Sequence, residues 1–395
     1  MANKWHEYLW GDLATLEYDK RLRGYENRPG PYPVYGTNGL IGRHTDPLCQ
    51  HPGVIIGRKG AYRGVHYSDK PFFVIDTAFY LEPKVDIDLK WAYYQLLTQN
   101  INSMDSGSAI PSTSRDAFYK LPVKVPPLPE QKAIASILGE LDDKIGLNRK
   151  MNETLEAMAR AIFKSWFVDF DPIPGLGHHK EWQDSPLGKI PKGWRVEKIS
   201  DAFAINPSRP IKKGLEYPYV DMANLPTASA RVKDIVHREF RGSGSKFKNG
   251  DILIARITPC LENGKTAFVD FLSGNECGWG STEFIVFGPK EPLNMWFMYC
   301  VARDPEFRDH ATRSMSGTSG RQRVEIGCFN NYTIVIPPAE VIDKFGGIVG
   351  TWFYRMKAND DQSRTLAVIR DVMLPKLLPG EIRVMETAEI IRGAV

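Results

Sequence analysis

The stretch PPLPEQKAIASILGELDDKI (126–145) joins two kinds of predicted structure. It follows the strand-like run LPVKV (121–125) and opens an apolar pattern with alternating steps of four and three residues. Ile134, Leu138, Leu141 and Ile145 begin this pattern, which predicts the apolar face of a long helix. No proline interrupts residues 130–170, so we expect a rod of roughly 60 Å at 1.5 Å per residue.

The same plan occurs twice in the chain. The run YTIVI (332–336) ends in a second proline pair at 337–338, and a second seam follows with Val349, Trp352 and Met356. A polar step interrupts each seam, at positions 148 and 152 and again at 359 and 363. The offset is 194 − 5 = 189 between the opening tryptophans and 338 − 127 = 211 between the proline pairs, so the second copy carries extra residues.

Strand-like runs bounded by glycine, proline and asparagine precede each helix, at 32–42, 53–58, 72–76 and 78–82 and again at 251–256, 265–271 and 283–287. Short helical patterns occur at 89–98 and 295–301. We therefore predict an α+β fold with two globular domains alternating with two long helices, which pair as an antiparallel coiled coil with pseudo-twofold symmetry. The predicted boundaries are 1–126 for the first domain, 127–171 for the first helical spacer, 172–193 for a linker, 194–338 for the second domain, 339–378 for the second spacer and 379–395 for a tail.

The composition is that of an ordinary globular protein. The 395 residues are 42% hydrophobic and 25% charged, with a formal net charge of +4, which permits nucleic-acid binding without arguing for it. The five cysteines lack CxxC spacing, and we see neither a signal peptide nor an apolar run long enough for a membrane span. We expect a cytoplasmic protein with reduced thiols and no membrane contact.

Motifs for catalysis are missing from the sequence. The segment LENGKT (261–266) resembles the end of a phosphate-binding loop, but Pro259 stands where its first glycine should be. His44, Cys49 and His51 could bind zinc, but we interpret them as incidental residues of one loop and predict no metal site. No GxSxG or HExxH motif is present. These observations favour a binding protein.

Glycine-rich and hydroxyl-rich loops with arginine recur at matching places in the two copies, and such loops suit contacts to phosphates and base edges. The predicted DNA-binding residues of the first domain are Arg58, Lys59, Arg63, Ser106, Ser108, Ser112 and Arg115. Those of the second are Arg256, Lys265, Arg313, Ser316, Thr318, Arg321 and Arg323. We expect Ile134, Leu138, Leu141, Ile145, Val349, Trp352 and Met356 to pack the helices together.

The chain resembles the specificity (S) subunits of type I restriction–modification systems over nearly its whole length. The resemblance rests on YPVYGTNGLIG (32–42), the serine-rich segment at 106–118 and above all the stretch at 126–145. The second copy, PPAEVIDKFGGIV (337–349), keeps the apolar spacing but lacks the LPEQ motif of the first copy.

The resemblance implies that each globular domain is a target-recognition domain for one half of a bipartite site in double-stranded DNA. It implies helices that set the unread gap and dock two methylation subunits, and restriction subunits that join the complex. It implies a non-catalytic chain, with S-adenosylmethionine, ATP and magnesium bound by the partner subunits. We expect the exposed faces of the helices, and Trp166 and Phe167 near one helix end, to meet the methylation subunits.

Two other classes remain open at this point. A coiled-coil scaffold that binds no DNA explains the helices but not the arginine loops at matching places. A stand-alone nuclease or methyltransferase requires a carboxylate cluster or a cofactor loop that we do not find. Salt-dependent retention on DNA distinguishes the scaffold, and an assay of the isolated chain tests the enzyme.

Overall fold

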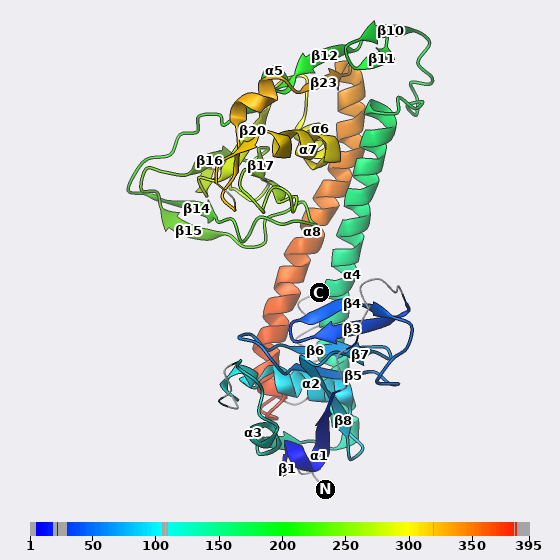
Figure 1. Cartoon of the computed structure of the whole chain (residues 1–395), viewed down its shortest axis with the longest axis vertical. Helices are drawn as coiled ribbons and strands as arrows, with labels where there is room; N and C mark the ends of the chain where they lie inside the picture. The colour runs from blue at the N-terminus through cyan, green and yellow to red at the C-terminus, as the bar shows by residue number, and fades with distance from the viewer. Residues whose placement is uncertain are drawn as a thin grey trace. The chain divides into compact units, whose positions relative to one another are not determined.

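The computed structural model describes residues 5–18, 22, 30–104, 107, 110–318, 320–382 and 384. It divides into two units: unit 1 comprises Met1–Gly146 and Gln362–Val395, and unit 2 comprises Leu147–Asp361. Two long helices, α4 (Leu128–Phe167) and α8 (Ala339–Leu377), run from one unit into the other. Each unit therefore contains one globular part and one half of each long helix (Figure 1).

Unit 1 begins with a small α+β globule. Its elements are β1 (His6–Leu9), α1 (Trp10–Leu13), β2 (Ala14–Glu17), β3 (Tyr32–Gly36), β4 (Gly39–His44), β5 (Gly53–Gly57), β6 (Val65–Ser68), β7 (Phe73–Val74), β8 (Ala78–Pro83), α2 (Leu89–Leu97), η1 (Ile101–Ser103), α3 (Arg115–Tyr119) and β9 (Pro122–Val125). The strands and the helix expected at 32–42, 53–58, 72–76, 78–82 and 89–98 are confirmed.

Unit 2 repeats this order with additions. Its elements are β10 (Trp182–Ser185), β11 (Gly188–Pro191), β12 (Arg195–Lys198), α5 (Ile199–Ala202), β13 (Phe203–Ile205), β14 (Glu216–Val220), β15 (Val236–Glu239), β16 (Ser245–Lys248), β17 (Ile252–Ala255), β18 (Thr266–Phe268), β19 (Cys277–Gly280), β20 (Phe284–Pro289), α6 (Met295–Arg303), α7 (Pro305–Arg313), β21 (Met315–Ser316), β22 (Arg323–Val324), η2 (Ile326–Asn330) and β23 (Thr333–Ile336). The segment expected to be a linker contains the antiparallel pair β10–β11.

The two globules share one sheet plan. One sheet has the order β2-β8-β5-β6 in unit 1 and β13-β20-β17-β18 in unit 2. The other sheet has the order β4-β3-β7 in unit 1 and β15-β14-β19-β16 in unit 2, and in both units this second sheet contains one parallel pair. Where β16 pairs with β19, unit 1 has only the isolated bridge between Cys49 and Phe72. The extra residues of the second copy therefore include a full strand.

The first and last strands of each globule pair with each other. β1 pairs antiparallel with β9, and β12 pairs antiparallel with β23. Each closing strand leads through its proline pair directly into α4 or α8. Because proline lacks an N–H and is tolerated in the first turn of a helix, the pair ends the strand without disturbing the helix. The stretch at 126–145 thus decides both the closure of the globule and the start of the long helix.

The seam residues predicted from the sequence are buried between α4 and α8 or against the globules. In unit 1, Ile134, Leu138 and Leu141 share a core with Leu366 and Met373 of α8, and Ile145 packs on its edge. In unit 2, Val349 and Met356 belong to the core that contains Phe163 of α4, and Trp352 packs on its edge.

The pairing of the two helices is antiparallel in each unit. In unit 2 the Asn148 Nδ2 donates to the Asn359 carbonyl oxygen at 3.2 Å, whereas Phe163 meets Phe345 further along. Within this unit the two helices also run side by side in Figure 1. The predicted antiparallel coiled coil is confirmed within each unit.

Pro375 lies inside α8 rather than at its end. It occupies the last turn, where a missing N–H removes a single intrahelical hydrogen bond, so the helix continues to Leu377. Among the described residues, no helix combines the length and the apolar character that crossing a membrane requires.

Candidate nucleic-acid interface

The loop after β5 lies against the segment before α3, although the two are far apart in the sequence. The Arg58 N–H donates to the Thr77 carbonyl oxygen at 2.8 Å, and the Thr113 N–H donates to the Arg58 carbonyl oxygen at 2.8 Å. Lys59 and Ser112 form an isolated antiparallel bridge. We call residues 58–60 and 111–115 the first strip. The structure thus brings together two loops that the sequence offered separately.

Arg58 is held by an aromatic platform. Its guanidinium carbon lies 3.9 Å from the centre of the Tyr18 ring and 5.5 Å from that of Phe79. The guanidinium of Arg115 lies over the same rings at 5.1 and 5.0 Å. Each such contact contributes roughly 0.5–1 kcal/mol at an exposed site. The platform fixes two planar cations side by side, and neither Tyr18 nor Phe79 was identified from the sequence.

These side chains surround a polar pocket of about 300 Å³. Its lining comprises Tyr18, Arg58, Lys59, Phe79, Ser112, Thr113, Ser114, Arg115 and Asp116. Asp76 anchors the rim, because its carboxylate pairs with the Lys59 ammonium at 3.1 Å and its carbonyl accepts from the Arg58 guanidinium at 2.8 Å. Fixed guanidinium planes beside hydroxyl groups match the edges of bases and the oxygens of phosphates.

Unit 2 contains the same backbone arrangement after β17. The Arg256 N–H donates to the Glu283 carbonyl oxygen at 2.9 Å, and the Val324 N–H donates to the Arg256 carbonyl oxygen at 2.8 Å. Ile257 and Arg323 form the isolated bridge that corresponds to Lys59 and Ser112. We call residues 256–258 and 321–324 the second strip. Arg58 and Arg256 therefore occupy equivalent positions on equivalent scaffolds.

The two strips differ in the side chains that they present. Lys59 of the first strip corresponds to Ile257 of the second, and Ser112 corresponds to Arg323. Arg323 makes a bidentate contact to the Glu283 carboxylate, with Nε and Nη2 at 3.0 and 2.7 Å from Oε1. A shared scaffold with different donors is suited to recognising two unlike sequences.

The other predicted DNA-binding residues fall into three groups. Arg321 is exposed within the second strip, Ser316 is exposed where β21 pairs with Arg323, and Thr318 and Arg313 are exposed after β21 and at the end of α7. Ser106 and Ser108 lie outside the described residues. Lys265 is half-buried, and its ammonium donates to the Met222 carbonyl oxygen at 2.6 Å.

Arg63 departs from its predicted role. It is 3% exposed, and its guanidinium donates to the carbonyl oxygens of Asn102 at 2.8 Å and of Gly60 at 3.2 Å. A buried guanidinium needs such partners, so Arg63 shapes the loop of the first strip instead of facing a ligand. Sequence alone could not separate it from Arg58, because both follow glycine-rich backbone with the same composition.

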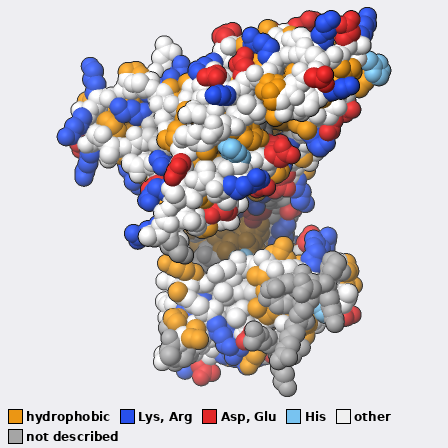
Figure 2. All heavy atoms as spheres, turned by 45° about the horizontal axis from the view of Figure 1, so that its top comes forward, with side chains coloured by type: hydrophobic (Ala, Val, Ile, Leu, Met, Phe, Trp, Pro, Cys, Tyr) orange, Lys and Arg blue, Asp and Glu red, His pale blue; other side chains and the backbone are white. Residues whose placement is uncertain are grey.

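A second basic surface was largely missed. It lies on β14–β16 of unit 2, where Arg238 covers the Tyr219 ring at 4.2 Å and Lys246 covers the Phe240 ring at 5.1 Å. Lys212, Lys213 and Arg241 are exposed nearby in sequence. Figure 2 shows Lys and Arg side chains gathered on the projecting edge of this unit. The doublet at 212–213 and the run HREFRG (237–242) were the available signals.

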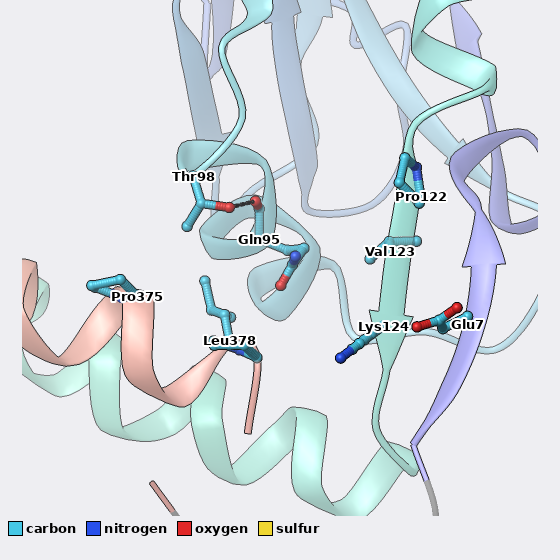
Figure 3. A pocket seen from close by; sticks show the side chains of 9 residues that line it. Glu7, Gln95, Thr98, Pro122, Val123, Lys124, Pro375 and Leu378 are labelled. Atoms are coloured by element: carbon cyan, nitrogen blue, oxygen red, sulfur yellow. Dashed lines mark hydrogen bonds between the residues drawn. The ribbon is translucent and has the colours of Figure 1, made fainter. Parts of the chain in front are cut away.

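A further pocket, of about 560 Å³, lies within unit 1 between β9, α2 and the end of α8 (Figure 3). Val123, Pro375 and Leu378 form much of its wall, and Glu7 and Lys124 lie at one side. The Thr98 hydroxyl donates to the Gln95 carbonyl oxygen and is thereby occupied. This pocket shares no residue with either strip.

The expectation that Trp166 and Phe167 face a partner is wrong. Both are 4% exposed and pack against Phe345 of α8 in the core of unit 2. Large apolar side chains are instead exposed elsewhere on the long helices: Leu147 and Met158 on α4, and Tyr354, Val368 and Val372 on α8.

Comparison with known proteins finds relatives of this chain among the specificity subunits of type I restriction enzymes. The family model of the type I restriction modification DNA specificity domain matches residues 3–157. The type I restriction enzyme MjaIX specificity subunit of Methanocaldococcus jannaschii is 26% identical over 321 residues, which cover 77% of this chain and 71% of the relative. The HindI specificity subunit of Haemophilus influenzae is 24% identical over 383 residues, which cover 80% of this chain and 82% of the relative.

The fold likeness extends over the whole chain. The crystal structure of a type I restriction-modification system S subunit from M. genitalium aligns with a TM-score of 0.61 at 18% identity, covering 96% of this chain and 97% of that one. The duplicated domains and the paired long helices of this chain are therefore consistent with its likeness to these specificity subunits. The chain is similar to the DNA specificity subunits of type I restriction–modification systems over most of its length, and residues 3–157 match their specificity domain.

Proposed function

We propose that the first and second strips each read one half of a bipartite site in double-stranded DNA. The observation that carries this proposal is the equivalence of Arg58 and Arg256, which share the same pair of backbone hydrogen bonds in the two units. Arginine is the side chain best suited to bidentate contact with guanine in the major groove. Relatives that match most of this chain are named specificity subunits, and we propose that this chain likewise supplies DNA specificity without catalysis.

The difference between the strips supports two unlike half-sites. Lys59 is a point charge suited to phosphate, whereas its counterpart Ile257 offers only apolar contact. The basic surface on β14–β16 extends the electrostatic footprint of unit 2, and its aromatic rings orient the cations. The scaffold alternative gives no reason for the same arginine on the same scaffold in both units.

The long helices are the proposed spacer and docking region. We infer that two methylation subunits bind their exposed faces, where Tyr354 is 65% and Val368 63% exposed. S-adenosylmethionine, ATP and magnesium then belong to the methylation and restriction subunits. The gap length and the twofold relation of the strips stay predictions.

Charge reversal tests the strips directly. Arg58→Glu and Arg321→Glu are compared with the wild type in a complex with the methylation subunits, using fluorescence anisotropy on cognate DNA at moderate salt. Each reversal removes one cation and adds one anion, so we expect a large loss of affinity and a shallower salt dependence. Lys70→Glu, an exposed residue of unit 1 outside the strip, is the matched control. Unchanged affinity for both strip variants contradicts the assignment.

A further inference from the structure

Three metal-binding side chains meet in unit 1, away from the first strip. The Cys49 thiol, the His51 imidazole and the Glu82 carboxylate place one ligand atom each within 4.8 Å of one another. Cys49 is buried, and the other two are partly exposed. It is the one such cluster that the described residues form. Glu82 comes from β8, so its approach to the loop at 49–51 could not be predicted from sequence spacing.

The distances between these atoms fit a tetrahedral zinc ion. Zinc binds sulfur at about 2.3 Å, imidazole nitrogen at about 2.0–2.1 Å and carboxylate oxygen at about 2.0–2.2 Å, so tetrahedral angles separate sulfur from nitrogen by about 3.5 Å and nitrogen from oxygen by about 3.4 Å. Cys49 Sγ lies 3.6 Å from both ring nitrogens of His51, and His51 Nε2 lies 3.4 Å from Glu82 Oε2. The sulfur–nitrogen and nitrogen–oxygen separations therefore match those of a zinc site.

The imidazole of His51 is oriented for metal binding. Its Nδ1 lies 2.7 Å from the Pro52 carbonyl oxygen, which can only accept, so Nδ1 carries the proton and donates. Nε2 is then left with its lone pair, and it lies 3.6 Å from Cys49 Sγ and 3.4 Å from Glu82 Oε2. A backbone carbonyl bound to the distal nitrogen is the usual support of a zinc-ligating histidine, because it fixes the tautomer and the ring.

The backbone around Cys49 is also anchored. The Cys49 N–H donates to the Phe72 carbonyl oxygen at 2.9 Å, and the Phe72 N–H donates back to the Cys49 carbonyl at 3.0 Å. In unit 2 the strand β16 stands at this position and pairs over its whole length with β19. Unit 1 has a short loop at this position, and a metal ion bound by Cys49, His51 and Glu82 would link that loop to β8 of the neighbouring sheet. A pocket of about 300 Å³ borders His51 and leaves room for a water molecule.

We propose that Cys49, His51 and Glu82 bind a zinc ion that ties the loop between β4 and β5 to β8, with water as the fourth ligand. Binding displaces the thiol proton of Cys49 to solvent and leaves the thiolate as the ligand. The proposal is independent of DNA binding, since none of the three residues belongs to the first strip.

The full-length chain, stripped with a chelator and dialysed against zinc, tests this site by metal analysis. We expect a single zinc ion to be retained by the wild type and lost from Cys49→Ser and Glu82→Gln, with affinity reduced by more than the roughly 10–100-fold that loss of an outer-shell partner costs. His44→Gln is the matched control, because His44 lies nearby in sequence but outside the cluster. It retains the metal.

Two further measurements distinguish the loss of a zinc ligand from misfolding of a variant. Glu82 is partly exposed, so Glu82→Gln leaves the fold intact and still removes a ligand. Zinc raises the melting temperature of the wild type and of His44→Gln but not that of Glu82→Gln. Cobalt gives a thiolate charge-transfer band that disappears in Cys49→Ser. A wild-type chain that retains no zinc, or equal retention in all variants, overturns the proposal, and a plain imidazole–carboxylate contact then explains the cluster.

Discussion

At the scale of the residue, Arg58 and Arg256 occupy equivalent positions in the two units, but their surroundings differ. Arg58 is clamped between the Asp76 carbonyl and an aromatic platform, whereas Arg256 donates through Nη2 to the Val324 carbonyl oxygen at 3.2 Å. A planar cation with fixed orientation discriminates between bases, and a mobile ammonium does not. The strips are therefore expected to read sequence and not only charge.

Replacing Arg58 with lysine separates these two contributions. Arg58→Lys keeps the charge but loses the stacked, bidentate geometry, so we expect the preference for cognate over non-cognate DNA to fall by about 1–3 kcal/mol. The slope of affinity against salt changes little, because the number of cations is unchanged. Competition binding at two salt concentrations measures both quantities, with Lys70→Arg as control. An unchanged preference, or a loss that appears only as a salt effect, contradicts a base-reading role.

At the scale of the element, α4 and α8 are held by polar contacts as well as by their apolar seam. In unit 2 the Asn152 Nδ2 donates to the Asp360 carboxylate at 2.7 Å, and the Asn359 Nδ2 donates to the Asn152 carbonyl oxygen of the side chain at 2.8 Å. Asn359 is 2% exposed. Buried amides in a seam fix the register of paired helices at a cost in stability.

The contacts of Asn152 and Asn359 predict that the single variant Asn152→Leu is less stable than the double variant Asn152→Leu with Asn359→Leu. Leucine removes the acceptor of the Asn359 amide, which we expect to cost about 1–3 kcal/mol, whereas Asn152→Leu with Asn359→Leu replaces both partners and recovers most of that loss. Chemical denaturation followed by circular dichroism measures the difference, and Lys150→Leu on the exposed face of α4 is the control. A single variant as stable as the wild type shows that these amide contacts do not couple the helices.

A buried carboxylate on α4 joins the helix to α6. Glu156 is 5% exposed, accepts from the Tyr299 hydroxyl at 2.9 Å and pairs with the Arg303 guanidinium at 3.0 Å. Burial and the neighbouring Glu156 carboxylate raise the pKa of Tyr299, so its hydroxyl stays protonated and keeps donating. In unit 1 the Tyr94 hydroxyl makes the corresponding contact to Asp142 of α4 at 2.7 Å.

Removing this carboxylate is expected to destabilise unit 2. Glu156→Ala leaves the Arg303 charge buried without its partner, and breaking a buried pair in this way costs roughly 3–5 kcal/mol. Glu153→Ala, at an exposed position of the same helix, serves as control. Differential scanning calorimetry compares the two variants with the wild type. Equal melting behaviour for both substitutions refutes the anchoring role.

The long helices and the main strands could be predicted from the sequence because their signals are local: a periodic seam, proline pairs and short β-rich runs. The pairing of the two loops in each strip could not be predicted from the sequence. Arg58 and Thr113 are far apart in the chain, and only the tertiary fold brings them into hydrogen-bond contact. Tyr18, Phe79 and Glu82 were missed for the same reason. Arg63 and Trp166 were misplaced because composition does not tell which side of a loop or helix faces the core.

At the scale of the whole molecule, the duplication explains why one chain offers two recognition surfaces. Both globules close with paired first and last strands and then enter a long helix, so the same segment of each copy ends at the same kind of junction. The two strips present different side chains at equivalent positions, Lys59 and Ser112 in unit 1 and Ile257 and Arg323 in unit 2. A conserved frame with altered contacts fits a protein that recognises two different half-sites.

The most direct test of this account maps N6-methyladenine by long-read sequencing in the host, with the wild-type chain, with Arg58→Ala and with Arg256→Ala. We predict a split motif with a fixed gap in the wild type, and relaxed or lost methylation that begins at one half of the motif for Arg58→Ala and at the other half for Arg256→Ala. A methylation map that is identical in all three strains, or loss at the same half for both variants, contradicts the central claim that the two strips read separate halves.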